Sequence, residues 1–549
     1  MIVLKKNSFV EGTIIATIAI VIVKILGMLY VIPFYKIVGA NGGALYSYAY
    51  NIYLIFLGIS SAGLPDAIAK IISEYNTLGM EDAKNRAYKI GKQMISFISV
   101  VVFIALFVFA EEIGKFIIGD LNGVNTAKDI AFVVRCVSPS VLLIPFLSMT
   151  KGYLQGHKYI GPSSISQLVE QIVRIIVILL GSYLVLKVFE GTLSLAIGVA
   201  VSGAFVGGLV AYIYLKRAIK KANLYSLDEN KKDKITNKEI SKKIITYAIP
   251  FVIISVVTHL YNFTDQILVL RTLEGMGFLA EDVEFIASSI STWSPKICMI
   301  INSMAVGMTM SLVPTIVSAI TAKNEKEVEN KVNKSLSMIV FISLPLSIGL
   351  SILSTSVWTI FYDINPYGSD ILSLMVFSAL FGNLYLIVST ICQSLNKYKL
   401  VYMVSITGFL LNALLDIPIM YLFKFIGFKP FLGSITASII GYSVSVLIGL
   451  YNLKRENNIS YKDTFKSVLK TLIPALSMVL VLSVINYFIR FNQLTISGAI
   501  ITVIINAIIG GIIYIGISYK IGLIDHILGK EMINSIIKKL TLGKLKIKN

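Results

Sequence analysis

The chain has 549 residues, of which 56% are hydrophobic and only 14% are charged. Apolar stretches long enough to span a bilayer recur from end to end, which excludes an ordinary soluble globular protein and predicts an all-α polytopic membrane protein. The three cysteines fall inside apolar segments and the three histidines are far apart in the sequence. We therefore expect no disulfide framework, no metal site and no cofactor.

Fourteen apolar segments, separated by polar or turn-forming residues, predict about fourteen transmembrane helices. Two lysines precede the first segment, which is long and lacks a small-residue cleavage site, so we expect a retained helix and not a signal peptide. The expected spans are 9–37, 44–73, 90–111, 129–154, 163–188, 192–216, 243–271, 283–320, 335–361, 368–394, 400–424, 430–453, 467–490 and 494–518.

The net charge of +19 is a topology signal and does not indicate a nucleic-acid partner. Most of the 49 Lys and Arg residues lie in the termini and in the loops on the same side as the termini. By the positive-inside rule both termini are cytoplasmic, and attraction to anionic lipid is a second effect of the same charges. The opposite loops carry Lys36, Lys115, Lys128, Lys187, Arg271, Lys424, Lys429 and Arg490.

The longest polar interruption follows the sixth span and divides the first twelve spans into two sets of six. The sets resemble each other locally, because YLQGHKY (153–159) and ICQSLNKY (391–398) each close a fourth span. An even number of spans in each set predicts parallel repeats. The expected parts are an N-terminal six-helix lobe (1–220), a cytoplasmic linker (221–242), a C-terminal six-helix lobe (243–455), two further transmembrane helices (456–518) and a cytoplasmic amphipathic tail (519–549), which is predicted to lie on the membrane surface.

Several charged residues fall inside the expected spans, where an ionisable group costs at least a few kcal/mol. Glu170 and Arg174 are four residues apart and share a helix face, and Lys24 and Arg174 lie about 22 Å and about 16 Å into their spans. Lys24 and Arg174 are candidate substrate-binding residues, and Glu170 would orient Arg174. Alternatively, Glu170 and Arg174 neutralise each other and pin two helices, and Lys24 pairs with a carboxylate on a neighbouring helix.

Four further charges are weaker candidates. Arg135 and Asp265 lie nearer the outer ends of their spans, Lys296 follows Pro295, and Asp416 lies near a proline. Arg135 and Lys296 are candidates for substrate binding, and Asp265 and Asp416 are candidates for ion coupling or orientation. Interfacial anchoring is the alternative for charges near a span end.

Positive groups at membrane depth favour an anionic headgroup over a neutral or cationic drug, because Lys and Arg are the usual partners of phosphate. Tyrosines in the second span could contact sugars, although interface anchoring explains them equally well. Pro33, Gly63 and Pro65 are candidate gating residues, since they permit bending, although small residues in membrane helices more often serve close packing.

Residues 152–174, GYLQGHKYIGPSSISQLVEQIVR, resemble the signature of the stage V sporulation protein B group of polysaccharide transporters. That group belongs with the MurJ-like lipid II flippases in the multidrug/oligosaccharidyl-lipid/polysaccharide (MOP) superfamily. KILGMLYVIPFYKIVGA (24–40) is similar to the first helix of that family, with Lys24 at a basic position. The further arginines and acidic residues of Gram-negative MurJ proteins are replaced here by Tyr30, Val31 and aliphatic residues, so only the Lys24 position carries over.

The resemblance implies a MOP-type transporter fold of two six-helix lobes in the bacterial plasma membrane, working by alternating access, with the lipid tail along spans thirteen and fourteen. It implies a monomeric flippase for an undecaprenyl-pyrophosphate-linked saccharide, lipid II above all, driven by membrane potential, sodium or protons. A flippase for a capsule or teichoic-acid oligosaccharide, a multidrug or cation exporter, a membrane glycosyltransferase and a scaffold are the alternatives. No catalytic set of side chains supports the enzyme.

Overall fold

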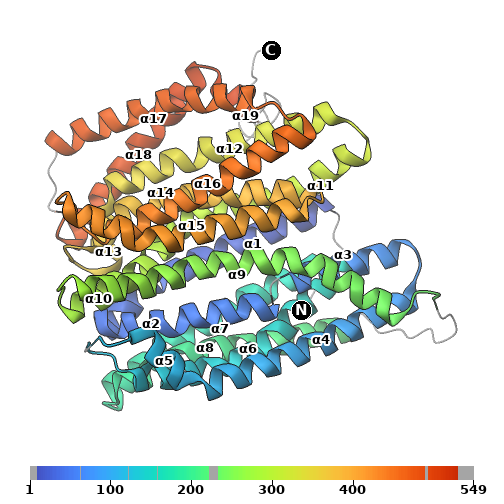
Figure 1. Cartoon of the computed structure of the whole chain (residues 1–549), viewed down its shortest axis with the longest axis horizontal. Coiled ribbons are helices and arrows are strands. Elements are labelled where there is room, and N and C mark those ends of the chain that lie inside the picture. Colours follow the sequence, from blue (N-terminus) through green and yellow to red (C-terminus); the bar gives the residue numbers. More distant parts are fainter. Residues whose placement is uncertain are drawn as a thin grey trace. The chain divides into compact units, whose positions relative to one another are not determined.

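The structure is a computed structural model that describes residues 9–61, 63–121, 123–157, 159–221, 233–488 and 493–528. Within these ranges it consists of nineteen α-helices and two π-helical turns, without a strand (Figure 1). Twelve helical stretches in the described part are long and apolar enough to cross a bilayer. The all-α membrane architecture is thus confirmed, whereas the count of fourteen spans stays a prediction.

By internal packing the described chain divides into two compact units. The first comprises the residues up to Ser303 together with Val401–Gly441, and the second comprises Met304–Leu400 together with the residues from Tyr442 onward. The boundaries fall inside three helices, α11 (Ser294–Thr321), α15 (Tyr398–Phe425) and α16 (Leu432–Asn457). These units are defined by contacts within the structure, whereas the expected lobes are defined by the repeat in the sequence. The assignment of the lobes therefore stays a prediction.

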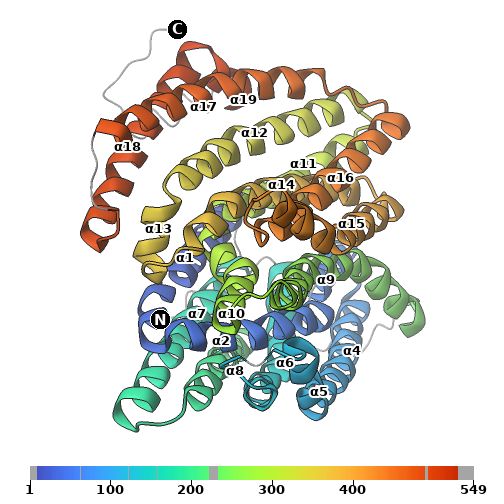
Figure 2. The same cartoon turned by 60° about the vertical axis from the view of Figure 1, so that its left-hand side comes forward.

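In the first unit α6 is central, because it packs against α2, α3, α4, α5 and α8. Figure 2 shows α6 between α4 and α8. The helices of this unit, besides parts of α11, α15 and α16, are α1 (Phe9–Leu29), α2 (Val31–Ser61), α3 (Leu64–Thr77), α4 (Glu81–Val108), α5 (Ala110–Ile118), α6 (Ala127–Gly156), α7 (Ile160–Tyr183), α8 (Leu193–Lys221), α9 (Asn237–Gly275) and α10 (Ala280–Ser288), with π-helical turns η1 (Leu184–Val188) and η2 (Ser289–Trp293).

In the second unit α12 packs against α14 and α17, and α18 packs against α13 and α17. The buried hydroxyl of Tyr514 on α18 donates to the backbone oxygen of Phe341 on α12 at 2.6 Å. The remaining helices are α12 (Glu325–Ile352), α13 (Ser354–Tyr362), α14 (Gly368–Ser394), α17 (Lys462–Phe488), α18 (Ile496–Lys520) and α19 (Leu523–Leu528).

Two of the longest helices begin at capping boxes that are legible in the sequence. Thr126 accepts a hydrogen bond from the Asp129 backbone N–H and donates its own backbone N–H to the Asp129 carboxylate, at the start of α6. Thr236 and Glu239 make the same reciprocal pair at the start of α9. Each box satisfies two backbone donors that the helix itself leaves free.

The expected break between the first two spans, at residues 38–43, coincides with a sharp kink in α2 at Gly39. Its φ of 67° and ψ of −173° are not helical, so two helical segments of α2 meet at this glycine. A further break, inside the expected second span, falls at Gly63 between α2 and α3, where φ is 74°. A Cβ at Gly63 would lie 2.6 Å from the backbone oxygen of Ala248 on α9, so the chain turns there in close contact with α9. Pro33 and Pro65 fall in the first turns of α2 and α3, where a missing N–H is tolerated.

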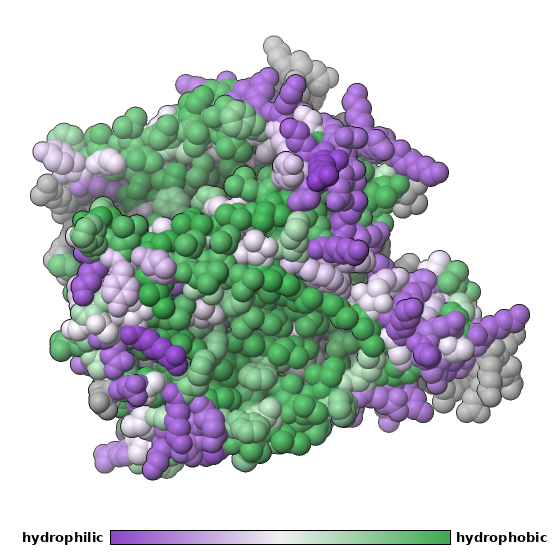
Figure 3. Space-filling view, in the orientation of Figure 1, coloured by the Kyte–Doolittle hydropathy of each residue, from purple (hydrophilic) through white to green (hydrophobic). Residues whose placement is uncertain are grey.

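Figure 3 shows apolar side chains over the middle of the helices and hydrophilic side chains gathered at helix ends. This is the distribution that a bilayer requires of a membrane-spanning surface. Of the expected cytoplasmic tail the structure describes α19 alone. The tail from residue 529 onward and linker residues 222–232 lie outside the described residues.

Candidate functional site

Glu170 on α7 holds two cationic side chains, one from its own helix and one from α6. Its carboxylate accepts from the Arg174 guanidinium at 2.8 Å and from the Lys151 ammonium at 2.8 Å. All three side chains are largely buried. The expected local pair therefore exists, but Lys151 turns it into a three-membered cluster with an excess of positive charge.

Two glycines on α8 bring that helix against the charged turn of α7. A Cβ at Gly207 would lie 2.5 Å from the Glu170 backbone oxygen, and one at Gly203 would lie 3.0 Å from that of Arg174. Gly203 and Gly207 form a GxxxG pair, which packs α8 against the α7 backbone at Glu170 and Arg174. Close contact with α8 thus fixes the position of the two α7 side chains.

Lys296 is only 8% exposed, and its partners are aromatic. Its ammonium donates to the Tyr30 hydroxyl at 2.7 Å and makes no ion pair in the described part of the chain. The preceding π-helical turn η2 ends at Trp293, one helical turn before Lys296. Four rings surround the ammonium, with centroids at 4.9 Å (Tyr30), 5.4 Å (Tyr46), 5.0 Å (Tyr50) and 5.7 Å (Trp293).

Tyrosines of α2 lie between Lys296 and Arg174. The rings of Tyr46 and Tyr50 stack at 5.4 Å beside Lys296, and Tyr50 continues to Tyr53 at 6.4 Å. All three hydroxyls are electrostatic neighbours of Arg174. The structure therefore brings Lys296 and Arg174 to one tyrosine-rich face of α2, which the sequence alone did not establish.

Lys24 lies on α1, half-buried, without an ion pair or hydrogen bond in the described part of the chain. The alternative of a carboxylate partner on a neighbouring helix therefore finds no support. One turn further, a Cβ at Gly27 would meet the Gln171 amide at 3.3 Å and Met299 at 3.8 Å. Helix α1 thus packs beside the Glu170–Arg174 turn of α7 and the start of α11.

Arg135 does not join these residues. Its Nε donates to the Phe107 backbone oxygen at 3.3 Å, near the end of α4 where helix carbonyls lack partners. It precedes Lys151 on α6 by 16 residues, or about 24 Å along the helix. This contact is a helix-capping interaction, and substrate binding by Arg135 stays a prediction.

A second polar cluster contains the predicted residues Asp265 on α9 and Asp416 on α15. Asp265 accepts from Asn412 at 3.0 Å and from Ser438 at 2.8 Å. Asp416 is fully buried beside Asp265 and Ser434, and neither of its carboxylate oxygens makes a hydrogen bond in the described part of the chain. Two buried carboxylates thus share one site without a basic residue paired to either in that part.

A buried uncharged network joins α2 to α9 and η2. Ser47 and Asn51 of α2 hydrogen-bond to Gln266 and Thr292, at 2.7–3.1 Å, and Ser47 also contacts Ser291. The network fixes α2 against the turn that precedes Lys296. No metal-binding group of three or more His, Cys, Asp or Glu residues occurs in the searched part of the chain.

Sequence reasoning missed Lys151, Asn412 and Ser438. Lys151 immediately precedes the motif at 152–174, and its distance from Glu170 along the chain gives no hint of contact. Asn412 lies one helical turn before Asp416, a spacing that places both on one face and could have signalled a polar site.

Four cationic side chains, Lys24, Lys151, Arg174 and Lys296, lie on membrane helices with one carboxylate, Glu170, among them, an arrangement typical of the polar path through a membrane transport protein. Residues 9–319 match the family model described as polysaccharide biosynthesis protein, and residues 287–417 match the MatE model. The chain is 32% identical to the lipid II flippase MurJ of Bacillus subtilis, over 96% of this chain and 98% of that protein. It belongs to the polysaccharide biosynthesis protein family, in its MurJ-like group.

Two further comparisons agree with this family assignment. The stage V sporulation protein B of Bacillus subtilis is 22% identical, over 61% of this chain and 62% of that protein. A solved structure of a lipid II flippase MurJ in an inward closed conformation has a TM-score of 0.65 at 19% identity, covering 93% of this chain and 99% of that one, and shows the common fold. The resemblance inferred from residues 152–174 is confirmed, and the chain is a multi-pass membrane protein.

Proposed function

We propose that this protein is a flippase for a lipid-linked saccharide whose lipid and sugar are joined by pyrophosphate, with the peptidoglycan precursor lipid II as the favoured substrate. The observation that carries the proposal is the cationic set of Lys24, Lys151, Arg174 and Lys296, which contains only one carboxylate. An excess of positive charge at membrane depth is costly unless an anion offsets it. The name of the relative at 32% identity supports the choice of substrate.

Each residue has a distinct part in the proposal. Arg174, oriented by Glu170, offers guanidinium donors to a phosphate oxygen, and its buried Nε has no hydrogen-bond partner in the described structure. Lys24 supplies a second, unpaired ammonium. Lys296 lies over aromatic rings and has no carboxylate paired to it in the described structure, and the tyrosines beside it offer faces and hydroxyls to sugar.

The proposed direction is from the cytoplasmic to the outer leaflet by alternating access. The positive-inside distribution supports a cytoplasmic origin for the end of α7 that carries Glu170. The turn at Gly63, in contact with α9, and the kinked start of α2 are proposed as points of bending during the change. Membrane lipids and the substrate are the proposed partners, and the protein is proposed to act as a monomer.

A coupled cation is proposed as co-substrate at Asp265 and Asp416. Two buried carboxylates that repel each other favour uptake of a proton or Na⁺, and Asn412 and Ser438 add neutral oxygen and amide groups. Flipping by purified protein in vesicles would then depend on the Na⁺ gradient or on pH, and Asp416→Asn would abolish this dependence. Unchanged dependence in this variant would contradict the coupling site.

A flippase for a capsule or teichoic-acid oligosaccharide uses the same pyrophosphate chemistry and is the nearest alternative. An exporter of cationic drugs would need an excess of carboxylates at the tyrosine face, whereas Glu170 there is already shared by two cations. A glycosyltransferase is disfavoured because the relatives named above are transporters by name.

The deciding experiment is complementation of a strain depleted of its lipid II flippase. We expect the wild type to restore growth and Arg174→Ala, Lys24→Ala and Lys296→Ala to fail at equal expression. Lys128→Ala, at an exposed lysine without an ion pair in the described structure, is the matched control and should grow normally. Failure of the well-expressed wild type would sink the lipid II assignment, and growth of all three variants would overturn the cationic mechanism.

A further inference from the structure

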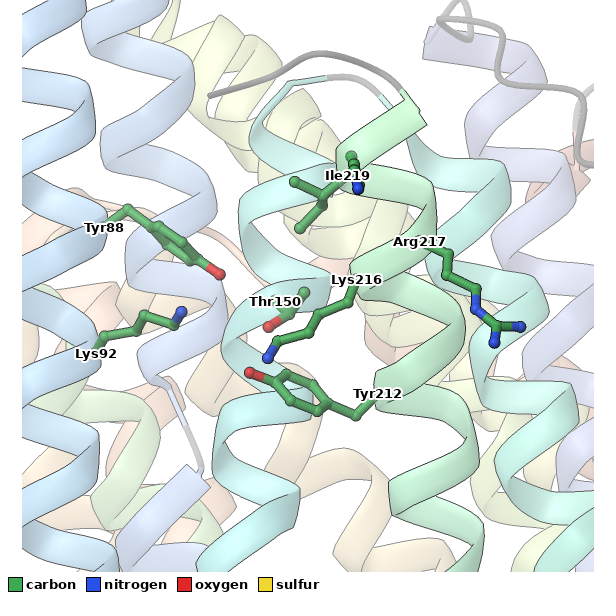
Figure 4. Close-up of a pocket in the computed structure, with 8 residues that line it drawn as sticks. Tyr88, Lys92, Thr150, Tyr212, Lys216, Arg217 and Ile219 are labelled. Atoms are coloured by element: carbon green, nitrogen blue, oxygen red, sulfur yellow. The ribbon is translucent and has the colours of Figure 1, made fainter. Parts of the chain in front are cut away.

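A basic pocket lies between α4, α6 and α8, with a volume of about 450 Å³ (Figure 4). In Figure 4 the side chains of Tyr88 and Lys92 on α4 point toward Thr150 on α6 and toward Tyr212 and Lys216 on α8. Tyr88 and Thr150 are buried and form its inner wall. The lining is completed by Arg217, Ile219 and Lys220.

No carboxylate from the described part of the chain lines this pocket. Lys92 lies over the Tyr88 ring at 5.2 Å, and Lys216 over the Tyr212 ring at 5.0 Å, and neither makes an ion pair in the described part of the chain. Two ammonium groups that face one pocket repel each other, and a bound anion would relieve this repulsion.

The pocket lies at the border between water and hydrocarbon. Lys92 is the last charged residue before the apolar part of α4, and Lys216 is the first after the apolar part of α8. Beyond the lysines both helices expose apolar side chains, such as Phe97 (72% exposed) and Val100 on α4 and Leu209 on α8. Leu209 is two turns from Lys216 on the same face, so an apolar surface continues from the pocket toward the membrane interior.

We propose that this pocket binds the phosphate headgroup of an anionic membrane lipid, in the leaflet that the basic loops assign to the cytoplasm. The ammonium groups of Lys92 and Lys216 donate to the phosphate oxygens, the Tyr212 hydroxyl contributes a further hydrogen bond, and the acyl chains lie along the exposed apolar side chains of α4 and α8. Basic pockets between membrane helices on the cytoplasmic side are suited to such headgroups. A soluble phosphate would use the lysines but would leave the adjoining apolar surface unexplained.

The site is distinct from the cationic residues of the proposed transport path. Lys151 follows Thr150 on α6, yet its ammonium reaches Glu170 on α7 and not the pocket. Helix α6 therefore presents Thr150 to the lipid pocket and Lys151 to the α7 cluster. Headgroup binding at this pocket does not depend on which saccharide the protein carries.

The test measures binding of phosphatidylglycerol, phosphatidylcholine and inorganic phosphate to the purified, delipidated full chain by native mass spectrometry. We expect phosphatidylglycerol to bind in preference to phosphatidylcholine. Lys92→Gln/Lys216→Gln should weaken phosphatidylglycerol binding about twenty-five-fold, since each basic residue at an anionic surface contributes about fivefold. The matched control Lys238→Gln/Lys242→Gln removes two exposed lysines from α9 and should bind as the wild type does.

Equal losses in the two double variants, or equal binding of the two lipids, would overturn the proposal. Full competition by inorganic phosphate would assign the pocket to a soluble phosphate and overturn the lipid. Because the double variant can lose folding, protection of Lys92 and Lys216 in the wild type from an amine-reactive reagent provides a second readout. Phosphatidylglycerol should protect both lysines, and phosphatidylcholine should protect neither; the opposite pattern contradicts the site.

Discussion

The cluster at Glu170 and the cluster at Asp265 lie in the same compact unit and handle buried charge in opposite ways. At Glu170 one carboxylate holds Lys151 and Arg174, and Lys296 beyond it is held by aromatic rings. At Asp265 a second carboxylate, Asp416, lies alongside without a cation paired to it in the described structure. The first region has more cationic than anionic groups, and the second has, among the described residues, two carboxylates without a paired cation.

We infer from this difference that the net charge left after pairing within a buried cluster, rather than the number of its charged residues, indicates which ligand the cluster would bind. A buried charge without its partner costs several kcal/mol, so each cluster is least stable when empty and gains most from a ligand of opposite sign. An anionic headgroup would serve the first cluster and a small cation the second. Substitutions at four positions test this comparison.

The largest effect is expected from Glu170→Gln. This change leaves Lys151 and Arg174 facing each other without their shared carboxylate, and loss of one partner from a buried pair costs about 3–5 kcal/mol. We expect a clear fall in the thermal unfolding temperature of the purified protein. In the matched control, Glu111→Gln, the exposed pair with Lys115 is lost at a cost of about 1 kcal/mol or less. Equal shifts would mean that the Glu170 cluster is not a buried ion pair in the membrane.

Gly207→Ala tests whether the α8 contact holds the cationic cluster in place. The new Cβ would lie 2.5 Å from the Glu170 backbone oxygen, so α7 must move away, and overpacking of this kind costs about 1–3 kcal/mol. Unfolding temperature and complementation should both fall. Gly511→Ala on α18 is the control, because nothing lies within 4 Å of its Cβ position, and it should be neutral or slightly stabilising. A neutral Gly207→Ala would show that α7 and α8 are less closely packed.

Much of the fold could be predicted from the sequence because a bilayer demands long apolar helices, and capping residues such as Thr126 and Thr236 mark their starts. The break at Gly39 could also be predicted, because glycines at 39, 42 and 43 mark a point where a membrane helix can bend, and Gly39 adopts a positive φ that other residues rarely adopt. The break at Gly63 could not be predicted in this way, because it depends on contact with α9, which is remote in sequence.

Candidate site residues could be predicted where a charged residue lies far from both ends of an apolar segment. Lys24, Glu170 and Arg174 were found because a charge far from both ends of an apolar helix is costly wherever the helix packs. The aromatic cage of Lys296 was not found, since its hydrogen-bond partner Tyr30 is 266 residues away in sequence. Asp265 and Asp416 are likewise neighbours only because α9 packs against α15, and helix periodicity does not predict which helices pack together.

A smaller effect, of opposite sign to that of Glu170→Gln, is expected from Asp416→Asn. Neutralising one of two adjacent buried carboxylates removes their repulsion, so stability in Na⁺-free buffer should rise by about 1 kcal/mol. The increase in unfolding temperature that Na⁺ gives the wild type should disappear, because a ligand stabilises only the state that binds it. The control is Asp463→Asn, at an exposed acidic residue in the first turn of α17. Destabilisation by Asp416→Asn would place a positive partner at this carboxylate and break the comparison.

The smallest effect on stability is expected at Lys296. Loss of its charge should affect transport while leaving the free energy of unfolding almost unchanged. Lys296→Arg keeps a cation over the four rings and should change the free energy of unfolding by less than about 1 kcal/mol. Lys296→Met loses cation–π contacts of about 0.5–2 kcal/mol but also removes the cost of burying an ammonium, so its net effect is small as well. Complementation should be retained by Lys296→Arg and lost by Lys296→Met, while Lys128→Met, at an exposed lysine, changes neither measurement. If Lys296→Met instead unfolds the protein as readily as Glu170→Gln does, the rings are a full charge partner, and Lys296 holds the helices together without offering its charge to a substrate.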